Sequence, residues 1–70
     1  MTYAEREQIL AKDIISTSEV AQLLGKSLSE ASRVVSRIRA TFQKQGKLRW
    51  NARGELATQD YCDYMNIERR

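Results

Sequence analysis

Apolar residues recur at helical spacing in the middle of the chain, and this pattern predicts the longest element, a helix from Ser27 to about Gln45. Residues three and four positions apart share one side of a helix. The side expected to be buried carries Ala31, Val34, Val35, Ile38 and Phe42, and the opposite side carries Ser32, Arg33, Ser36 and Arg37. One face is therefore expected to join a core, and the other is free to meet solvent or a ligand.

Helix-start signals predict a second, shorter helix just before the long one. Ser16 with Glu19, and Ser27 with Glu30, each fit the capping box, in which a hydroxyl covers a free amide and the glutamate reaches back to the cap. Gly25 suits the left-handed residue that ends a helix. The shorter helix is expected to run from Ser16 to about Leu24 and to bury Val20, Leu23 and Leu24. The two helices and their turn predict a helix-turn-helix over about residues 16–45, a unit whose second helix lies in the DNA major groove.

The N-terminal segment predicts one further helix. Thr2 with Glu5 fits another capping box, and residues 3–12 follow as a short helix. Its candidate core residues are Tyr3, Ile9 and Leu10. Residues 13–15 are too few for a helix and are expected to form a brief extended link or an edge strand.

The segment after Gly46 predicts a β-hairpin. Polar and apolar residues alternate over residues 47–50, residues 51–54 resemble a turn, and Glu55–Ala57 can return as a second strand. A hairpin over about residues 47–57 would be the wing of a winged helix. Thr58 is expected to cap a last helix to about residue 66, with Tyr61, Tyr64 and Met65 on a packing face, followed by a frayed end over residues 66–70. The prediction is one domain over residues 1–70, mainly α with a small β-hairpin, arranged as a winged helix-turn-helix of about four helices and a two-stranded wing.

Composition places the chain among small soluble proteins. Its 70 residues are close to the lower limit at which a core holds a fold without metal or disulfides. Cys62 is the single cysteine, so no intramolecular disulfide can form, and a reducing cytoplasm suits the chain. No apolar run has the length of a membrane span and no signal-peptide pattern opens the sequence, so a cytoplasmic location without membrane contact is expected.

Positive charge is concentrated in the central part of the chain. Residues 16–54 contain eight Lys and Arg residues against two Glu residues, whereas the segments on either side are slightly acidic. A basic stretch on a helix-turn-helix has the distribution expected of a surface that meets phosphate. The alternative is a solvated basic face without a partner.

The chain offers little to an enzyme or to a metal site. It has no histidine, and Cys62 has no histidine partner that would activate its thiol. A zinc site needs about four Cys or His ligands. Asp60 and Asp63 fall on one side of the last predicted helix, where a surface pair of carboxylates usually serves only solvation. We therefore expect no catalytic residues, no metal ligands and no cofactor.

Duplex DNA is the ligand that the residue pattern favours. Arg33 and Arg37 lie one turn apart on the outer side of the long helix, where each could present a guanidinium fork to guanine. Leu28 is either a staple that covers the turn or an apolar contact to a thymine methyl group. The candidate contacts of this helix are Lys26, Ser27, Leu28, Ser29, Ser32, Arg33, Ser36 and Arg37. In the wing, Arg49 and Arg53 are candidates for phosphate or the minor groove, and Trp50 is expected to anchor the hairpin in the core rather than to stack on bases.

The chain resembles small winged-helix proteins from mobile elements of Gram-positive bacteria, including excisionase-like proteins of phages and integrative elements. The residues that carry this resemblance lie within about residues 14–66: Ser16, Glu19, Val20, Ala21, Leu23, Leu24, Gly25, Ser27, Gly46, Lys47, Leu48, Arg53, Gly54, Thr58 and Tyr61. The resemblance implies binding to duplex DNA, in control of excision or of transcription. The N-terminal helix, and Lys26 where a hydrophobic residue is usual, depart from the pattern.

A protein partner is the alternative from another class. An antirepressor-like modulator with the same fold could dock on a repressor or an integrase through its aromatic C-terminal face. Weak self-association on DNA is a further possibility. Salt-dependent binding to random duplex favours DNA as the ligand, and retention on a repressor or integrase without DNA favours the modulator.

Overall fold

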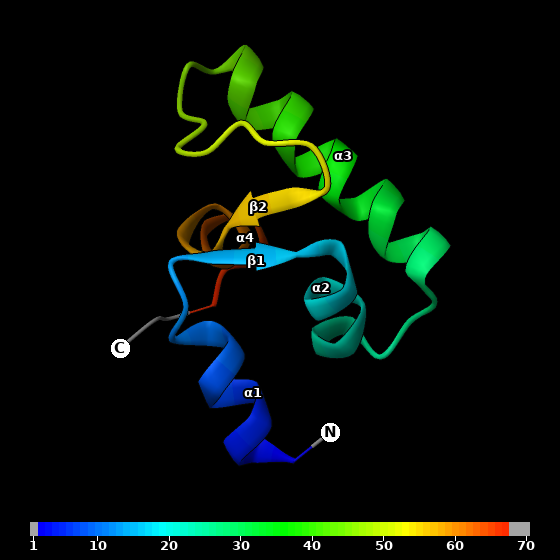
Figure 1. The fold of residues 1–70 in the computed structure, drawn as a ribbon. Helices are drawn as coiled ribbons and strands as arrows, with labels where there is room; N and C mark the ends of the chain where they lie inside the picture. Colours follow the sequence, from blue (N-terminus) through cyan, green and yellow to red (C-terminus); the bar gives the residue numbers. More distant parts are fainter. Residues whose placement is uncertain (1, 68–70) are drawn as a thin grey trace.

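The computed structural model describes residues 2–67, which form a mainly helical domain with a small antiparallel sheet (Figure 1). The elements in chain order are α1 (Tyr3–Leu10), β1 (Ile14–Ser16), α2 (Thr17–Leu24), α3 (Leu28–Lys44), β2 (Glu55–Ala57) and α4 (Thr58–Met65). The predicted class, mainly helical with a two-stranded sheet, is confirmed at this level. Helix ends at Leu10 and Lys44 fall one or two residues before the predicted ends.

The start of α2 follows the capping prediction closely. The Ser16 hydroxyl accepts a hydrogen bond from the Glu19 N–H, and the Glu19 carboxylate accepts one from the Ser16 N–H at 3.0 Å. Gly25 ends α2 in the left-handed region with φ of 66°. Local sequence signals alone therefore fix both ends of this helix.

The other two predicted capping boxes are only half formed. The Ser27 hydroxyl accepts from the Glu30 N–H, but it also donates to the Glu30 carboxylate at 3.1 Å. That carboxylate therefore points to the cap hydroxyl instead of the cap N–H. Thr2 and Glu5 at the start of α1 have the same arrangement.

The sheet joins different segments from those predicted. β2 pairs with β1 in antiparallel register, with Ile15 opposite Leu56, and both side chains are completely buried. The predicted hairpin over residues 47–57 is therefore wrong, because residues 45–54 form a loop, called here the α3–β2 loop. The physical reason is that Ile15 gives Leu56 a buried cross-strand partner, while the Arg49 N–H donates to an α4 side chain instead of a neighbouring strand.

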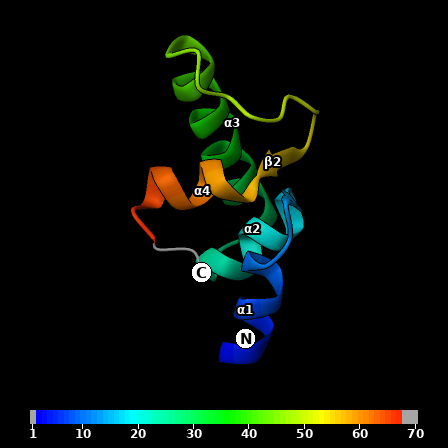
Figure 2. The ribbon, with the colours of Figure 1, turned by 90° about the vertical axis from the view of Figure 1, so that its left-hand side faces the viewer.

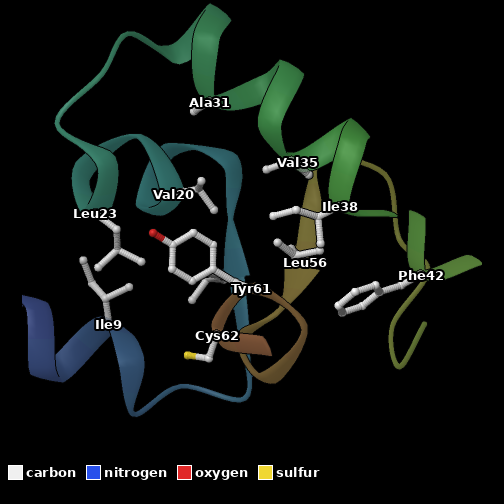
Figure 3. Close-up of a cluster of buried hydrophobic side chains, with 11 residues drawn as sticks. Ile9, Val20, Leu23, Ala31, Val35, Ile38, Phe42, Leu56, Tyr61 and Cys62 are labelled. Atoms are coloured by element: carbon white, nitrogen blue, oxygen red, sulfur yellow. The ribbon is translucent and has the colours of Figure 1, made fainter. Parts of the chain in front are cut away.

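The core lies between α3, the two strands and α4 (Figure 3). Four of the five apolar residues predicted for α3 are buried, and Val34 packs against them half-buried. Figure 3 shows the Tyr61 ring in the middle of the cluster, beside Val20 and Leu23 of α2. Burial raises the pKa of Tyr61, so its phenol stays neutral. The expectation that Tyr3 joins the core is wrong, since 74% of that residue is exposed.

The last helix differs from its prediction in three respects. Ala57 occupies the cap position and offers no side-chain hydrogen bond, and Thr58 is the first helical residue, completely buried. Tyr61 is buried while Tyr64 and Met65 are more than a third exposed, so they do not form one packing face. The predicted fraying is wrong at its start, because the Ile67 N–H donates to the Cys62 carbonyl at 2.8 Å and Ile67 packs against the core. Residues 68–70 lie outside the described residues.

In the view of Figure 1, α4 lies behind the two strands, and α3 and α4 contact each other as well as β2. Figure 2 shows the α3–β2 loop standing out from the helices before it returns to β2. No helix within residues 2–67 combines the length and apolar character needed to cross a bilayer.

Candidate nucleic-acid interface

The outward face of α3 carries two arginines among small side chains. Ser29, Ser32, Arg33, Ser36, Arg37 and Ala40 follow helical spacing, and all are exposed. Small residues on either side of the arginines would let the helix backbone approach a groove closely. The structure therefore brings together the face that the sequence predicts.

The side chains of Arg33 and Arg37 make no ion pair or hydrogen bond with any residue in the described part of the chain. The acids of α2 and α3 are used elsewhere, because Glu19 binds Lys12 and Glu30 lies 3.7 Å from Lys26. Both guanidinium groups are therefore available to a ligand.

A shallow hollow lies between the start of α2 and the start of α3. Thr17 of α2 lines it together with Leu28, Ser29, Ser32 and Arg33 of α3. Leu28 is 60% exposed, so it does not close the turn as a staple, and an outward apolar contact is the remaining interpretation of this side chain. The hollow places hydroxyl groups, one apolar group and one cation next to each other.

The turn between α2 and α3 contributes Lys26 and Ser27, both exposed. The Ser27 hydroxyl is engaged with Glu30 at the helix start. Lys26 forms a solvent-exposed pair with the same glutamate, an interaction worth about 0–1 kcal/mol at most. Lys26 can therefore leave this pair for a phosphate at little cost.

The end of the α3–β2 loop is fastened to the start of α2. The Gly54 carbonyl accepts two hydrogen bonds from Thr17, one from its N–H at 3.1 Å and one from its hydroxyl at 3.0 Å. Because Thr17 also lines the hollow on α3, the Gly54 end of the loop lies beside that hollow. Arg53 is exposed and has no ionic partner among residues 2–67.

Arg49 differs from its predicted place in a wing strand. Its backbone N–H donates to the Asp60 carboxylate at 3.0 Å, and its guanidinium donates to Asp60 at 2.6 Å and to Asp63 at 3.1 Å. The hydrogen bond with Asp60 raises the pKa of Arg49 despite slight burial. The loop therefore turns Arg49 toward α4 and away from the face of α3.

Asp60 and Asp63 are also not the solvated surface pair that the sequence predicts. The Asp60 side chain is completely buried, and hydrogen bonds from both the backbone and the guanidinium of Arg49 compensate its charge. Asp63 is 43% exposed. Its pKa is lowered by a hydrogen bond from Gln59, against slight burial, and further by Arg49.

Trp50 and its neighbour Asn51 also lie outside any wing strand. Trp50 is 41% exposed, so the expectation that it anchors the core is wrong. The Asn51 side chain accepts a hydrogen bond from the Arg39 guanidinium on α3. Sequence reasoning missed Arg39, Asn51 and Thr17 as residues that shape the site, and no local signal marks them because each partner is at least 12 positions away.

A second hollow lies on the α4 side of the molecule, away from the hollow at the start of α3. It has a volume of about 800 Å³, and its lining combines the apolar residues Phe42, Cys62 and Ile67 with the polar residues Gln45, Lys47, Arg49, Asp63 and Asn66. The Tyr64 ring meets Phe42 edge-on at a centroid distance of 6.3 Å. Cys62 is buried and reduced. Residues 2–67 contain no group of three acidic, His or Cys side chains suited to a metal ion.

A scan against protein-family models finds no match, and neither a curated protein nor a solved structure was found that matches the chain. The geometry of the two surfaces is therefore what bears on function.

Proposed function

We propose that this protein binds duplex DNA, with α3 in the major groove and the α3–β2 loop beside the sugar–phosphate backbone. The observation that carries the proposal is the outward face of α3, where Arg33 and Arg37 project without partners among small side chains. Two guanidinium groups one helical turn apart can each bind the major-groove edge of a guanine.

The order of elements supports a winged-helix interpretation of this surface. A helix, a strand, two helices joined by a tight turn and a returning strand follow one another, and the first strand pairs with the last. The α3–β2 loop takes the position of the wing, although it pairs with no strand. Arg53 at its end supplies a phosphate contact, and Lys26 in the turn supplies another.

Within this proposal, the biological role is control of excision or of transcription in a mobile element. It rests on the sequence resemblance to excisionase-like proteins and small regulators. Either role needs a small protein that binds duplex DNA at a defined site, and neither needs an enzyme.

The experiment is a fluorescence anisotropy titration with random and selected duplexes at several salt concentrations. Because each phosphate contact releases counterions, we expect the affinity to fall steeply as salt rises. Binding that is absent, or that does not change with salt, would contradict the proposal. The flanking genes decide between the two roles, since an adjacent integrase gene favours excision.

A protein-binding modulator is the second candidate, and the α4 side of the molecule supports it. Tyr64 and Met65 of α4 are exposed, and the hollow that Cys62 and Asp63 of the same helix help to line also has Phe42 and Ile67 in its lining. The burial of Tyr61 leaves a smaller aromatic face than the sequence predicts. Capture of a purified repressor or integrase in the absence of DNA, lost in Tyr64→Ala and Met65→Ala variants, is the result that this candidate requires.

A further inference from the structure

The α3–β2 loop has little backbone pairing of its own. Its first residues continue from α3, where the Lys47 N–H donates to the Phe42 carbonyl, and its last residues are fastened to Thr17. Residues 48–51 make no backbone-to-backbone hydrogen bond within residues 2–67. A projecting segment of this kind is expected to be mobile unless side chains hold it.

Two arginines supply the missing connections. Arg49 binds Asp60 of α4 with both its backbone N–H and its guanidinium, and the same guanidinium reaches Asp63. Arg39 reaches from α3 to the side chain of Asn51. The middle of the loop is thus tied to a helix on each side.

The Asp60 anchor is costly to break. Its carboxylate is completely buried, and Arg49 is the cation that compensates the charge. Removing one member of a buried pair leaves the other charge uncompensated. Arg49 is therefore committed to α4, while Arg53, four residues further along, remains without a partner among the described residues.

We propose that Arg49 and Arg39 are positioning residues that hold the α3–β2 loop in shape for DNA, while Arg53 makes the contact. This inference rests on the proposed DNA binding. The arginines bound to Asp60 and Asn51 shape the loop, and the unpartnered arginine meets phosphate. If only positive charge were considered, Arg39, Arg49 and Arg53 would all be expected to contact DNA.

Positioning by Asp60 and simple electrostatics predict opposite effects of one substitution. Asp60→Asn removes one negative charge and so raises the net charge of the protein by one, which by charge alone strengthens binding to DNA. If Asp60 positions the loop, the same substitution instead weakens binding, because the freed loop must be ordered again in the complex.

The test compares wild type with Asp60→Asn on a random duplex by fluorescence anisotropy. Glu7→Gln is the matched control, because it makes the same acid-to-amide change at an exposed position of α1. We expect Asp60→Asn to bind about three- to tenfold more weakly than this control. The salt dependence should stay that of wild type, since no phosphate contact is removed.

A second measurement follows the loop without DNA. Amide hydrogen exchange, read by NMR on the whole chain, should show a protected Arg49 N–H in the wild type and faster exchange over residues 48–53 in Asp60→Asn. Should Asp60→Asn fail to melt cooperatively, Asn51→Ala replaces it, because both Asn51 and the Arg39 contact are on the exposed surface. Asn51→Ala should also weaken binding, although it frees a guanidinium.

The outcomes separate the inference from the function on which it rests. Binding by Asp60→Asn that equals or exceeds the Glu7→Gln control overturns the inference while DNA binding stands. Faster loop exchange with unchanged affinity overturns it as well, because the loop then does not contribute to binding. A wild type that binds no duplex overturns the proposed function, whereas the exchange measurement still reports whether Asp60 holds the loop.

Discussion

The outward face of α3 and the α3–β2 loop carry the same kind of charge but use it differently. Arg33 and Arg37 on α3 have no partner in the described part of the chain, whereas Arg49 in the loop is bound to a buried carboxylate. The helix is stabilised by its own backbone hydrogen bonds and its buried apolar residues, so its arginines are not needed to hold its shape. The loop has no such support, and its Arg49 holds the loop in place by binding Asp60. A positively charged side chain therefore indicates a candidate interface only where it is not already bound to an acidic side chain of the same protein.

The largest effect is expected where both regions depend on one core residue. Val35 is only 4% exposed in the middle of the α3 stripe, and Val35→Asp would bury an unpaired carboxylate at a cost of several kcal/mol. A domain of this size holds about 5 kcal/mol or less in reserve. We expect circular dichroism to show lost helix and no cooperative melt.

The control for this variant is Ser36→Asp, which places the same acid one residue further on, at an exposed position. It should melt like the wild type and bind DNA less well. If Val35→Asp melts cooperatively instead, the helix is rotated from the phase described, and Arg33 and Arg37 leave the outward face.

The next effect concerns the α3 side of the comparison. Arg33→Ala and Arg37→Ala should each weaken binding to the cognate site by about 1–3 kcal/mol and relax its base preference. Footprinting and anisotropy on the single and double variants measure both quantities. Lys44→Ala, at the far end of the same helix, removes an equal charge and should leave the base preference as it is. If the double variant keeps the DNA affinity and the base preference of the wild type, the outward face of α3 does not recognise the bases.

A smaller effect separates the two arginines of the loop. Arg53→Ala should weaken binding to all duplexes alike and lower the salt slope by about one unit, because one phosphate contact is lost. Arg49→Ala should leave the slope unchanged. Anisotropy titrations at matched salt concentrations test this pair directly. A loss of affinity confined to one DNA sequence would mean that Arg53 contacts a base rather than a phosphate.

The smallest effect concerns α2, whose first residue, Thr17, lines the hollow at the start of α3. Burial raises the pKa of Glu19, but hydrogen bonds from Lys12 and from the Ser16 backbone outweigh it and hold that pKa below its ordinary value of 4.5. A lowered folded-state pKa contributes stability above pH 4.5, and this stability is lost as pH falls through the folded value. We expect a loss below about 1 kcal/mol in acid-range melts, absent in Glu19→Gln. An equal acid response in both proteins would assign the loss to other carboxyl groups.

The sequence predicts α2 and α3 well because their signals are local. Ser16, Glu19 and Gly25 act within one turn of the helix ends, and the apolar stripe of α3 has the helical period. Patterns of this kind are readable without knowing what the rest of the chain does.

The loop and the sheet could not be predicted in this way. The alternation over residues 47–50 suits a strand, but Arg49 is held by Asp60, 11 positions away, and β2 pairs with β1 across about 40 residues. Nothing near Asp60 marks it as buried, because its burial depends on a cation brought by another segment. The outward residues of α3 could thus be predicted from the sequence. Which arginines bind another part of the protein and which remain without a partner could not.

The most direct test of DNA binding by α3 is a map of the contact surface. We propose titrating the isotope-labelled protein with a short random duplex and following each backbone amide by NMR. We expect shifts over residues 28–37 and 53–54, at the hollow and the loop end, with little change at Tyr64 and Met65. Shifts confined to α4 and its hollow, with residues 28–37 unmoved, would contradict DNA binding by α3 and favour the protein-binding modulator.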